Sequence, residues 1–122
     1  MNLFFLAAGT SGRILEISKG LPKPLIKING ASILERNFRW VVKFKFIKRY
    51  FINTYFKPNH IKKEINKLEK KLKIKIKISN ERKLLGTAGA IKKIEKDLKK
   101  LFFVVYSDNL LNFNLLKMLQ FH

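Results

Sequence analysis

The sequence predicts an α/β domain with a mainly parallel sheet. Short runs rich in β-branched and aromatic residues alternate with longer stretches of helical periodicity, which is typical of repeated strand–helix units. With 122 residues and 47% apolar side chains, the chain is expected to bury the core of one domain over residues 1–122. It contains no cysteine, which excludes disulfides and thiolate chemistry and favours a cytoplasmic location.

The first third of the chain combines a strand, a small-residue turn and a helix. The apolar run at residues 2–6 predicts the first strand and is too short to cross a membrane. It leads into the turn at residues 7–13 and then into a loop whose glycine and two prolines prevent regular structure. Ser32 is the expected N-cap of a helix to about residue 45, because Glu35 follows three residues later and apolar residues recur at helical spacing.

The later elements follow the same alternation. Aromatic and β-branched residues predict a strand at 49–54, and Pro58 opens a helix to about residue 72 with one apolar stripe. Alternating Lys and Ile at residues 73–78 predict a strand at a sheet edge. Small residues then lead into a helix over 86–98, followed by the most hydrophobic strand, 101–106. A helical start at 115–121 has nothing after it to pack against, so we expect an interrupted fold.

The chain carries a formal net charge of +19, which favours polyanionic partners. Residues 57–77 hold nine lysines against two glutamates, and this motivates one hypothesis, a nucleic-acid-binding module. These lysines alternate with core residues as a solvated face does, and AT-rich codons alone favour Lys, Asn, Ile and Phe. We therefore rank nucleic-acid binding low. No apolar segment reaches the length of a membrane span.

Small residues follow the first expected strand and end at Arg13. Small side chains let backbone N–H groups approach a phosphate, and a guanidinium can bind phosphate oxygens in a bidentate fashion. Taken alone this signal is weak, since glycine turns are common and neither a P-loop nor a full dinucleotide motif is present. The candidate residues are Ala7, Ala8, Gly9, Thr10, Ser11 and Gly12.

Two further positions could carry chemistry. Lys23 stands between Pro22 and Pro24, which hold the backbone extended and fix where the ammonium points; a rigid loop with a solvated lysine is the simpler interpretation. Asp108 follows the hydrophobic strand at 101–106, where a carboxylate can hold Mg²⁺ against substrate phosphates. An aspartate in such a place is more often only a turn former.

Taken in order, these features resemble the signature of the sugar-1-phosphate nucleotidyltransferases, including mannose-1-phosphate guanylyltransferases and glucose-1-phosphate thymidylyl- or uridylyltransferases. The likeness covers essentially the whole chain. It runs through residues 6–13, 22–25, 30–34, 52–54, 85–90 and 106–110. The resemblance implies a Rossmann-like three-layer α/β/α fold, with this chain as its N-terminal nucleotide-binding part, truncated at the C-terminus.

The resemblance also implies a reaction and a role for each motif. A sugar-1-phosphate attacks the α-phosphate of a nucleoside triphosphate, giving a nucleotide sugar and pyrophosphate. The turn at Gly9 and Arg13 holds the triphosphate, Lys23 neutralises the α-phosphate, and Asp108 is one of two carboxylates on Mg²⁺. Nucleotide-binding residues close to the base and ribose are Gly86, Thr87, Ala88 and Gly89.

The chain departs from the family pattern in several places. Ser11 and Gly12 stand at the second glycine and the threonine of the usual turn, Glu16 replaces a proline, and Ser107 replaces a glycine. Family members also continue past this point with the sugar-phosphate pocket and the second metal carboxylate. We therefore do not expect efficient turnover from these 122 residues alone. A third hypothesis is a non-catalytic partner subunit that binds another chain through an open sheet edge.

Overall fold

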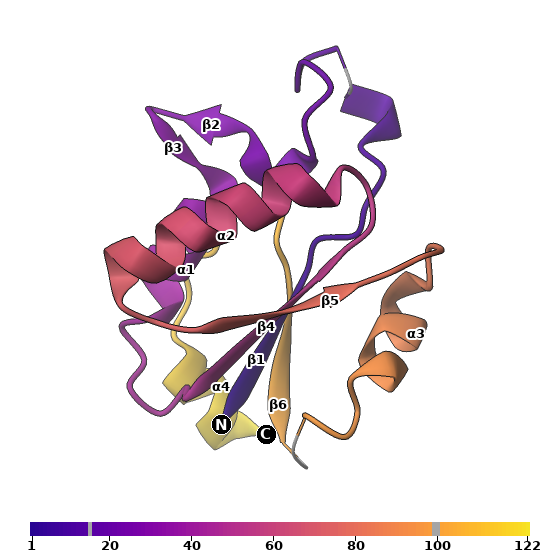
Figure 1. Cartoon of the computed structure of the whole chain (residues 1–122). Helices are drawn as coiled ribbons and strands as arrows, with labels where there is room; N and C mark the ends of the chain where they lie inside the picture. The colour runs from indigo at the N-terminus through magenta and orange to yellow at the C-terminus, as the bar shows by residue number, and fades with distance from the viewer. Residues whose placement is uncertain (15, 99–100) are drawn as a thin grey trace.

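The computed structural model describes residues 1–14, 16–98 and 101–122. Four parallel strands form the main sheet in the order β5-β4-β1-β6 (Figure 1). They are β1 (Asn2–Leu6), β4 (Arg49–Thr54), β5 (Ile76–Asn80) and β6 (Phe102–Tyr106). Because all four run the same way, their carboxyl ends meet at one edge of the sheet. The expected mainly parallel sheet is confirmed, and so is the edge position of β5.

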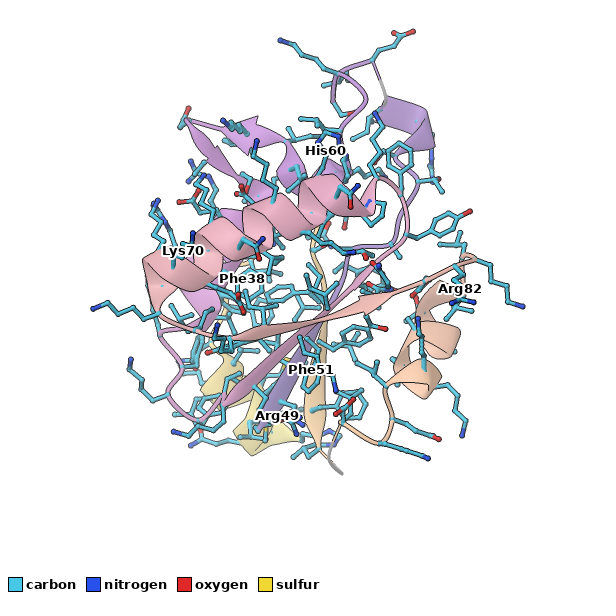
Figure 2. The ribbon with its side chains drawn as sticks, viewed as in Figure 1. Phe38, Arg49, Phe51, His60, Lys70 and Arg82 are labelled. Carbon is cyan, nitrogen blue, oxygen red and sulfur yellow. The ribbon has the colours of Figure 1, made fainter. Side chains whose placement is uncertain are left out.

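Helices cover both faces of the sheet. The helices are α1 (Ile33–Val41), α2 (Pro58–Leu72), α3 (Gly86–Lys93) and α4 (Leu115–Phe121). Alternate residues of β1 point to opposite faces: Leu3 and Phe5 join a core with α1, α2 and α4, whereas Phe4 packs with the α3 side. Figure 2 shows the same division, with Phe38 between α2 and the sheet and Phe51 toward α3. This confirms the Rossmann-like three-layer α/β/α fold.

The loop before α1 contains more regular structure than the sequence analysis expected. Short 3₁₀ helices form at Gly12–Ile14 and Lys23–Leu25, and β2 (Lys27–Ile28) pairs antiparallel with β3 (Ala31–Ser32). The hairpin turns at Asn29 and Gly30, both with positive φ (48° and 79°). Asn-Gly is the preferred pair for such a two-residue turn, so this signal was present in the sequence.

The strand expected at residues 73–78 is observed at 76–80, a correction with a clear cause. Lys73 adopts a left-handed conformation (φ 53°) that caps α2. The N–H of Ile74 then donates to the carbonyl of Glu69 at 3.3 Å, and the N–H of Ile76 donates to Oε1 of the same residue at 2.8 Å. Residues 73–75 are therefore committed to closing the helix, and pairing with β4 begins at Ile76.

Two helices end earlier than expected. Beyond Val41 and beyond Lys93, the backbone changes to i→i−3 turns, as in the bonds from Phe44 to Val41 (3.0 Å) and from Ile94 to Ile91 (3.1 Å). The N-cap of α1 is confirmed, since the N–H of Glu35 donates to Oγ of Ser32 at 3.0 Å. No helix of the described residues has the length and apolarity to span a bilayer.

Candidate functional site

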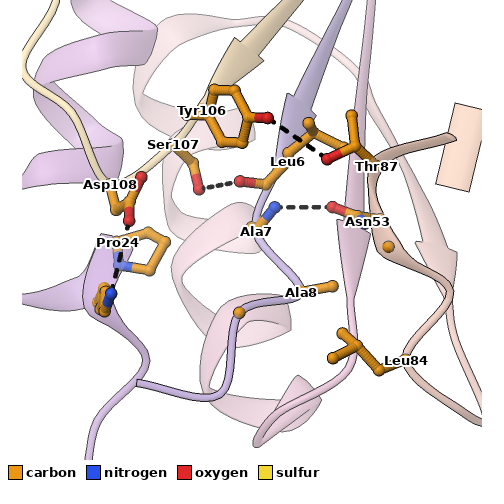
Figure 3. Close-up of a pocket in the computed structure, with 13 residues that line it drawn as sticks. Leu6, Ala7, Ala8, Pro24, Asn53, Leu84, Thr87, Tyr106, Ser107 and Asp108 are labelled. Atoms are coloured by element: carbon orange, nitrogen blue, oxygen red, sulfur yellow. Dashed lines mark hydrogen bonds and ion pairs between the residues drawn. The ribbon is translucent and has the colours of Figure 1, made fainter. Parts of the chain in front are cut away.

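A pocket opens at the carboxyl edge of the sheet, where β1, β4 and β6 end (Figure 3). Ligands of open parallel sheets bind at this edge, because the loops that follow the strands converge there. The cavity volume is about 270 Å³. Its lining comprises Leu6, Ala7, Ala8, Gly9, Lys23, Pro24, Asn53, Leu84, Gly86, Thr87, Tyr106, Ser107 and Asp108.

The turn after β1 contributes three predicted residues to this lining, Ala7, Ala8 and Gly9. The N–H of Ala7 donates to Oδ1 of Asn53 at 2.7 Å, which fixes the start of the turn against β4. A Cβ added at Gly9 would meet no described atom within 4 Å. The space beside this backbone is therefore open to a ligand.

Ser11 lies outside the pocket and joins two loops. Its φ is 61°, its side chain is buried, and its Oγ accepts a hydrogen bond from the N–H of Lys23 at 2.9 Å. The serine that departs from the family pattern thus anchors the segment that carries Lys23. Its hydroxyl is engaged by the backbone of Lys23 and is not part of the pocket lining.

Lys23 and Asp108 lie beside one another in the pocket lining. The distance from Nζ to Oδ2 is 3.9 Å, and both side chains are about one-third exposed. Pro22 and Pro24 flank the lysine and are buried. The backbone is extended at Pro22 but forms a 3₁₀ helix at Lys23–Leu25, so the expectation of extended backbone on both sides of the lysine was wrong. Figure 3 shows Asp108 and Pro24 on one side of the pocket and Leu84 on the other.

The segment that carries Asp108 is fixed by two buried polar residues. Both the N–H and Oγ of Ser107 donate to the carbonyl of Leu6, at 3.1 and 2.6 Å. Nδ2 of Asn37, on α1, donates to the carbonyls of Ser107 (3.2 Å) and Asn109 (2.8 Å). The serine that replaces a family glycine therefore ties the segment after β6 to the end of β1.

The small residues that begin α3 serve different purposes. Gly86 has φ +69° and lines the pocket with Thr87, whose Oγ1 lies 3.4 Å from the hydroxyl of Tyr106. Gly89 faces inward instead, since a Cβ there would lie 2.9 Å from Cβ of Leu85. Ala88 and Gly89 do not line the pocket.

Three other predicted residues also lie outside the lining: Thr10, Gly12 and Arg13. Arg13 sits in the 3₁₀ helix at Gly12–Ile14 with its side chain exposed, and no hydrogen bond or ion pair to it is found among the described residues. The structure thus brings Lys23 and Asp108 together and leaves Arg13 exposed, outside the pocket lining.

Sequence reasoning gave no role to two buried residues that support the pocket, Asn53 and Glu81. Nδ2 of Asn53 donates to Oε1 of Glu81 at 2.8 Å, and Oε2 of Glu81 accepts from the N–H of Leu85 at 3.1 Å. The available signals were a polar residue at the end of the apolar run 50–52 and an isolated acid in a lysine-rich segment. Neither signal identifies a partner without coordinates.

A divalent cation fits this pocket only together with a phosphate ligand. Asp108 is the one carboxylate in the lining, and the described residues contain no group of three or more His, Asp or Glu arranged to hold a metal. Mg²⁺ is commonly bound by one or two carboxylates plus substrate phosphates. Asp108 could therefore hold Mg²⁺ that arrives with a nucleotide.

Comparisons with known proteins agree with this geometry. The family model described as nucleotidyl transferase matches residues 4–122. The chain is 34% identical over 118 residues to D-glycero-alpha-D-manno-heptose 1-phosphate guanylyltransferase of Campylobacter jejuni, covering 97% of this chain and 52% of that protein. It is 29% identical to the mannose-1-phosphate guanylyltransferase catalytic subunit beta of Danio rerio, covering 100% of this chain and 34% of that subunit.

A solved structure shows the same relationship in three dimensions. HddC from Yersinia pseudotuberculosis, crystallised in complex with GMP-PN, superposes with a TM-score of 0.82 at 25% identity. The match covers 98% of this chain and 52% of HddC. The chain thus spans between a third and about half of the relatives it matches.

Proposed function

The chain belongs to the nucleotidyl transferase family, and we propose that its pocket binds a nucleoside triphosphate for transfer of the nucleotidyl group to a sugar-1-phosphate. The observation that carries the proposal is the convergence of Gly9, Lys23, Thr87 and Asp108 on one cavity at the carboxyl edge of a parallel sheet. These residues come from four separate segments, and each combines small size or charge with exposure to the cavity.

The proposed reaction is a displacement at the α-phosphate. An oxygen of the sugar-1-phosphate forms the new bond to the α-phosphorus, the bond from that phosphorus to the oxygen bridging the β-phosphate breaks, and pyrophosphate leaves. Lys23 neutralises charge at the α-phosphate, while the open backbone at Gly9 donates N–H groups to the triphosphate. Asp108 holds Mg²⁺, which supplies charge neutralisation to the phosphate oxygens.

Arg13 is proposed to bind the phosphates that leave as pyrophosphate. It is exposed and outside the pocket lining, so this role requires its side chain to move toward the pocket when the nucleotide binds. The role rests on the sequence resemblance and on the absence of competing partners among the described residues.

We further propose that a complete site needs polypeptide equivalent to the other half of the relatives, docked at the β6 edge. The β5 edge carries exposed lysines, including Lys77, which discourage pairing. The β6 edge and the segment after it instead expose Leu101, Val104, Tyr106, Leu110, Phe113, Leu116, Met118 and Phe121. A clean monomer in size-exclusion chromatography at high concentration would count against the alternative, in which the chain is a partner subunit that binds another chain through this face.

Calorimetry tests the nucleotide proposal. Because two relatives are guanylyltransferases, GTP with MgCl₂ is the first ligand to titrate. We expect measurable binding that Lys23→Ala weakens by about tenfold or more, since a charged hydrogen bond is lost. Lys27→Ala, which removes an exposed lysine of the same loop, is the matched control and should change affinity less than about twofold. No heat with the wild-type chain, or equal losses in both variants, contradicts the proposal.

A further inference from the structure

Two walls of the pocket come from loops that are distant in the sequence. One is the turn at residues 7–9, after β1; the other is residues 84–87, which run from the loop after β5 into the start of α3. A nucleoside bound in this pocket lies between them, so the distance between the walls decides how well it fits. This inference therefore rests on the proposed function.

A continuous chain of hydrogen bonds joins the two walls through buried side chains. The N–H of Ala7 donates to Oδ1 of Asn53 (2.7 Å), and Nδ2 of Asn53 donates to Oε1 of Glu81 (2.8 Å). Oε2 of Glu81 accepts from the N–H of Leu85 (3.1 Å). Glu81 is itself fixed to β4, because its N–H donates to the carbonyl of Thr54 at 2.8 Å.

The positions of donors and acceptors in these hydrogen bonds restrict which residue types can stand at positions 53 and 81. Oδ1 of Asn53 is occupied by a backbone donor, so Nδ2 must face Glu81, and both oxygens of Glu81 must accept. Asn53 is 3% exposed and Glu81 is 8% exposed. The described residues place no lysine or arginine in an ion pair with Glu81, although exposed lysines and arginines flank it in the sequence.

We propose that Asn53 and Glu81 are positioning residues that set the separation of the two pocket walls and thereby the affinity for the nucleoside part of the ligand. Burying a carboxylate that accepts hydrogen bonds only from amide N–H groups costs free energy. A change in one of these donors is therefore expected to shift the pocket wall to which the donor belongs. Among the phosphate-binding residues, Lys23 does not depend on this chain of bonds, because it is anchored through Ser11.

A reciprocal exchange of the two side chains tests the proposal. Asn53→Asp places two carboxylates at the present 2.8 Å contact, and Glu81→Gln leaves one amide N–H facing another donor. The double variant N53D/E81Q restores every bond. One oxygen of the carboxylate introduced at position 53 accepts from the N–H of Ala7, and its other oxygen accepts from the amide introduced at position 81. The oxygen of that amide accepts in turn from the N–H of Leu85.

The matched control is Asn2→Asp. Asn2 is a buried asparagine at the opposite end of the sheet, and its Nδ2 donates to the carbonyl of Asp97 at 3.1 Å. The substitution makes the same chemical change as Asn53→Asp in a strand of the same sheet. It leaves both pocket walls untouched, because neither wall contacts this end of β1.

The readout is calorimetric affinity for Mg²⁺-GTP and for Mg²⁺-tripolyphosphate, measured well below each melting temperature. Each single variant is expected to weaken the affinity for Mg²⁺-GTP by about tenfold and the affinity for Mg²⁺-tripolyphosphate by less than about twofold. The double variant is expected to return GTP affinity to within about twofold of wild type. Asn2→Asp should lower stability without changing either affinity.

Each outcome decides a separate point. Loss of both ligands in parallel, unchanged GTP affinity in the single variants, or a folded double variant without recovery overturns the positioning role and leaves the proposed function standing. Failure of the wild-type chain to bind GTP overturns the proposed function itself, and the positioning role with it. If a single variant does not fold, recovery of binding in the double variant supports the role and its absence refutes it.

Discussion

Two buried carboxylates in this molecule have opposite surroundings. Glu35, 2% exposed, lies between α1 and α2 and contacts nitrogen atoms of Arg39 (2.6 Å), Lys71 (2.6 Å) and Lys67 (3.6 Å). Among the described residues, Glu81, behind the pocket, accepts hydrogen bonds only from the amides of Asn53 and Leu85. One acid is neutralised by cations, and the other is held by neutral donors.

The difference shows where the positive charge of the chain is placed. Lysines gather on the outer side of α2 and β5, where some hold Glu35 and most face solvent; Lys70 points outward in Figure 2. Within the pocket lining the cationic residue is Lys23. The lysines of α2 and β5 therefore lie mostly on the solvent-facing side, whereas the candidate site is supported by buried polar side chains that have no cationic partner among the described residues.

The largest expected effect is a loss of stability when Glu35, which contacts three cations, is replaced. Glu35→Ala leaves three cations without their common anion and should lower the free energy of unfolding by about 2 kcal/mol, less than for a fully buried pair because the cations are half exposed. Urea unfolding measures the change. GTP affinity of the folded variant should stay within about twofold; a loss of binding would remove the distinction between the two regions.

The next largest effect is expected from a substitution in the pocket lining, which should weaken ligand binding about tenfold, or by about 1.4 kcal/mol. Asp108→Asn should weaken GTP by about this amount when Mg²⁺ is present and much less in EDTA, because the carboxylate acts through the cation. Titration of MgCl₂ alone should give no binding, as one carboxylate is insufficient. Equal losses with and without Mg²⁺ would show that Asp108 does not hold the metal.

The pH dependence of stability gives a smaller effect. Burial raises the pKa of Glu35, but the hydrogen bond from Lys71 and the charges of Arg39, Lys71 and Lys67 outweigh it, so this pKa lies below its ordinary value of 4.5. The stabilisation is therefore present above about pH 4.5 and is lost as pH falls through the folded-state pKa. The difference in unfolding free energy between wild type and Glu35→Gln, about 1 kcal/mol at pH 7, should shrink below about pH 4. A difference that grows in acid contradicts the assignment.

The smallest effect is expected from the solvated lysines. Replacing Lys63, Lys70 and Lys75 together with Ala should change GTP affinity by less than about twofold and stability by less than about 0.5 kcal/mol, because all three are exposed. The nucleic-acid hypothesis predicts instead that RNA affinity falls and that its salt dependence becomes shallower by about two. Filter binding over a range of salt concentrations separates the two hypotheses.

Most of the fold could be predicted from the sequence because each segment follows one strong local rule. Strand β1 lies where the apolar run predicts it, and helix α2 lies where Pro58 and the apolar stripe predict it. The predictions of element boundaries fail where a few backbone hydrogen bonds override the local sequence pattern. Lys73 caps α2 and delays β5, and Asn29-Gly30 forms a hairpin within a loop that was expected to be irregular.

The candidate site was predictable only in part. Gly9, Lys23, Thr87 and Asp108 were identified by motif and do line one pocket. Asn53 lies in a motif segment but was given no role, and Glu81 and Asn37 lie in none. Apart from the Glu81–Leu85 bond, their side chains bond to partners 28 to 74 residues away, and no local pattern encodes such pairs. Gly89 was assigned to the nucleotide but does not line the pocket, and a Cβ there would lie 2.9 Å from Cβ of Leu85, the residue that precedes α3.

The central claim is that a nucleotide binds at the carboxyl edge of the sheet. The most direct test is to follow backbone amide signals by NMR while Mg²⁺-GTP is added to the wild-type chain. We predict shifts confined to Ala8, Gly9, Thr10, Gly86, Thr87 and the residues around Asp108, with α2 and β5 unchanged. Shifts concentrated on the lysines of α2 and β5, or none at all, would contradict it.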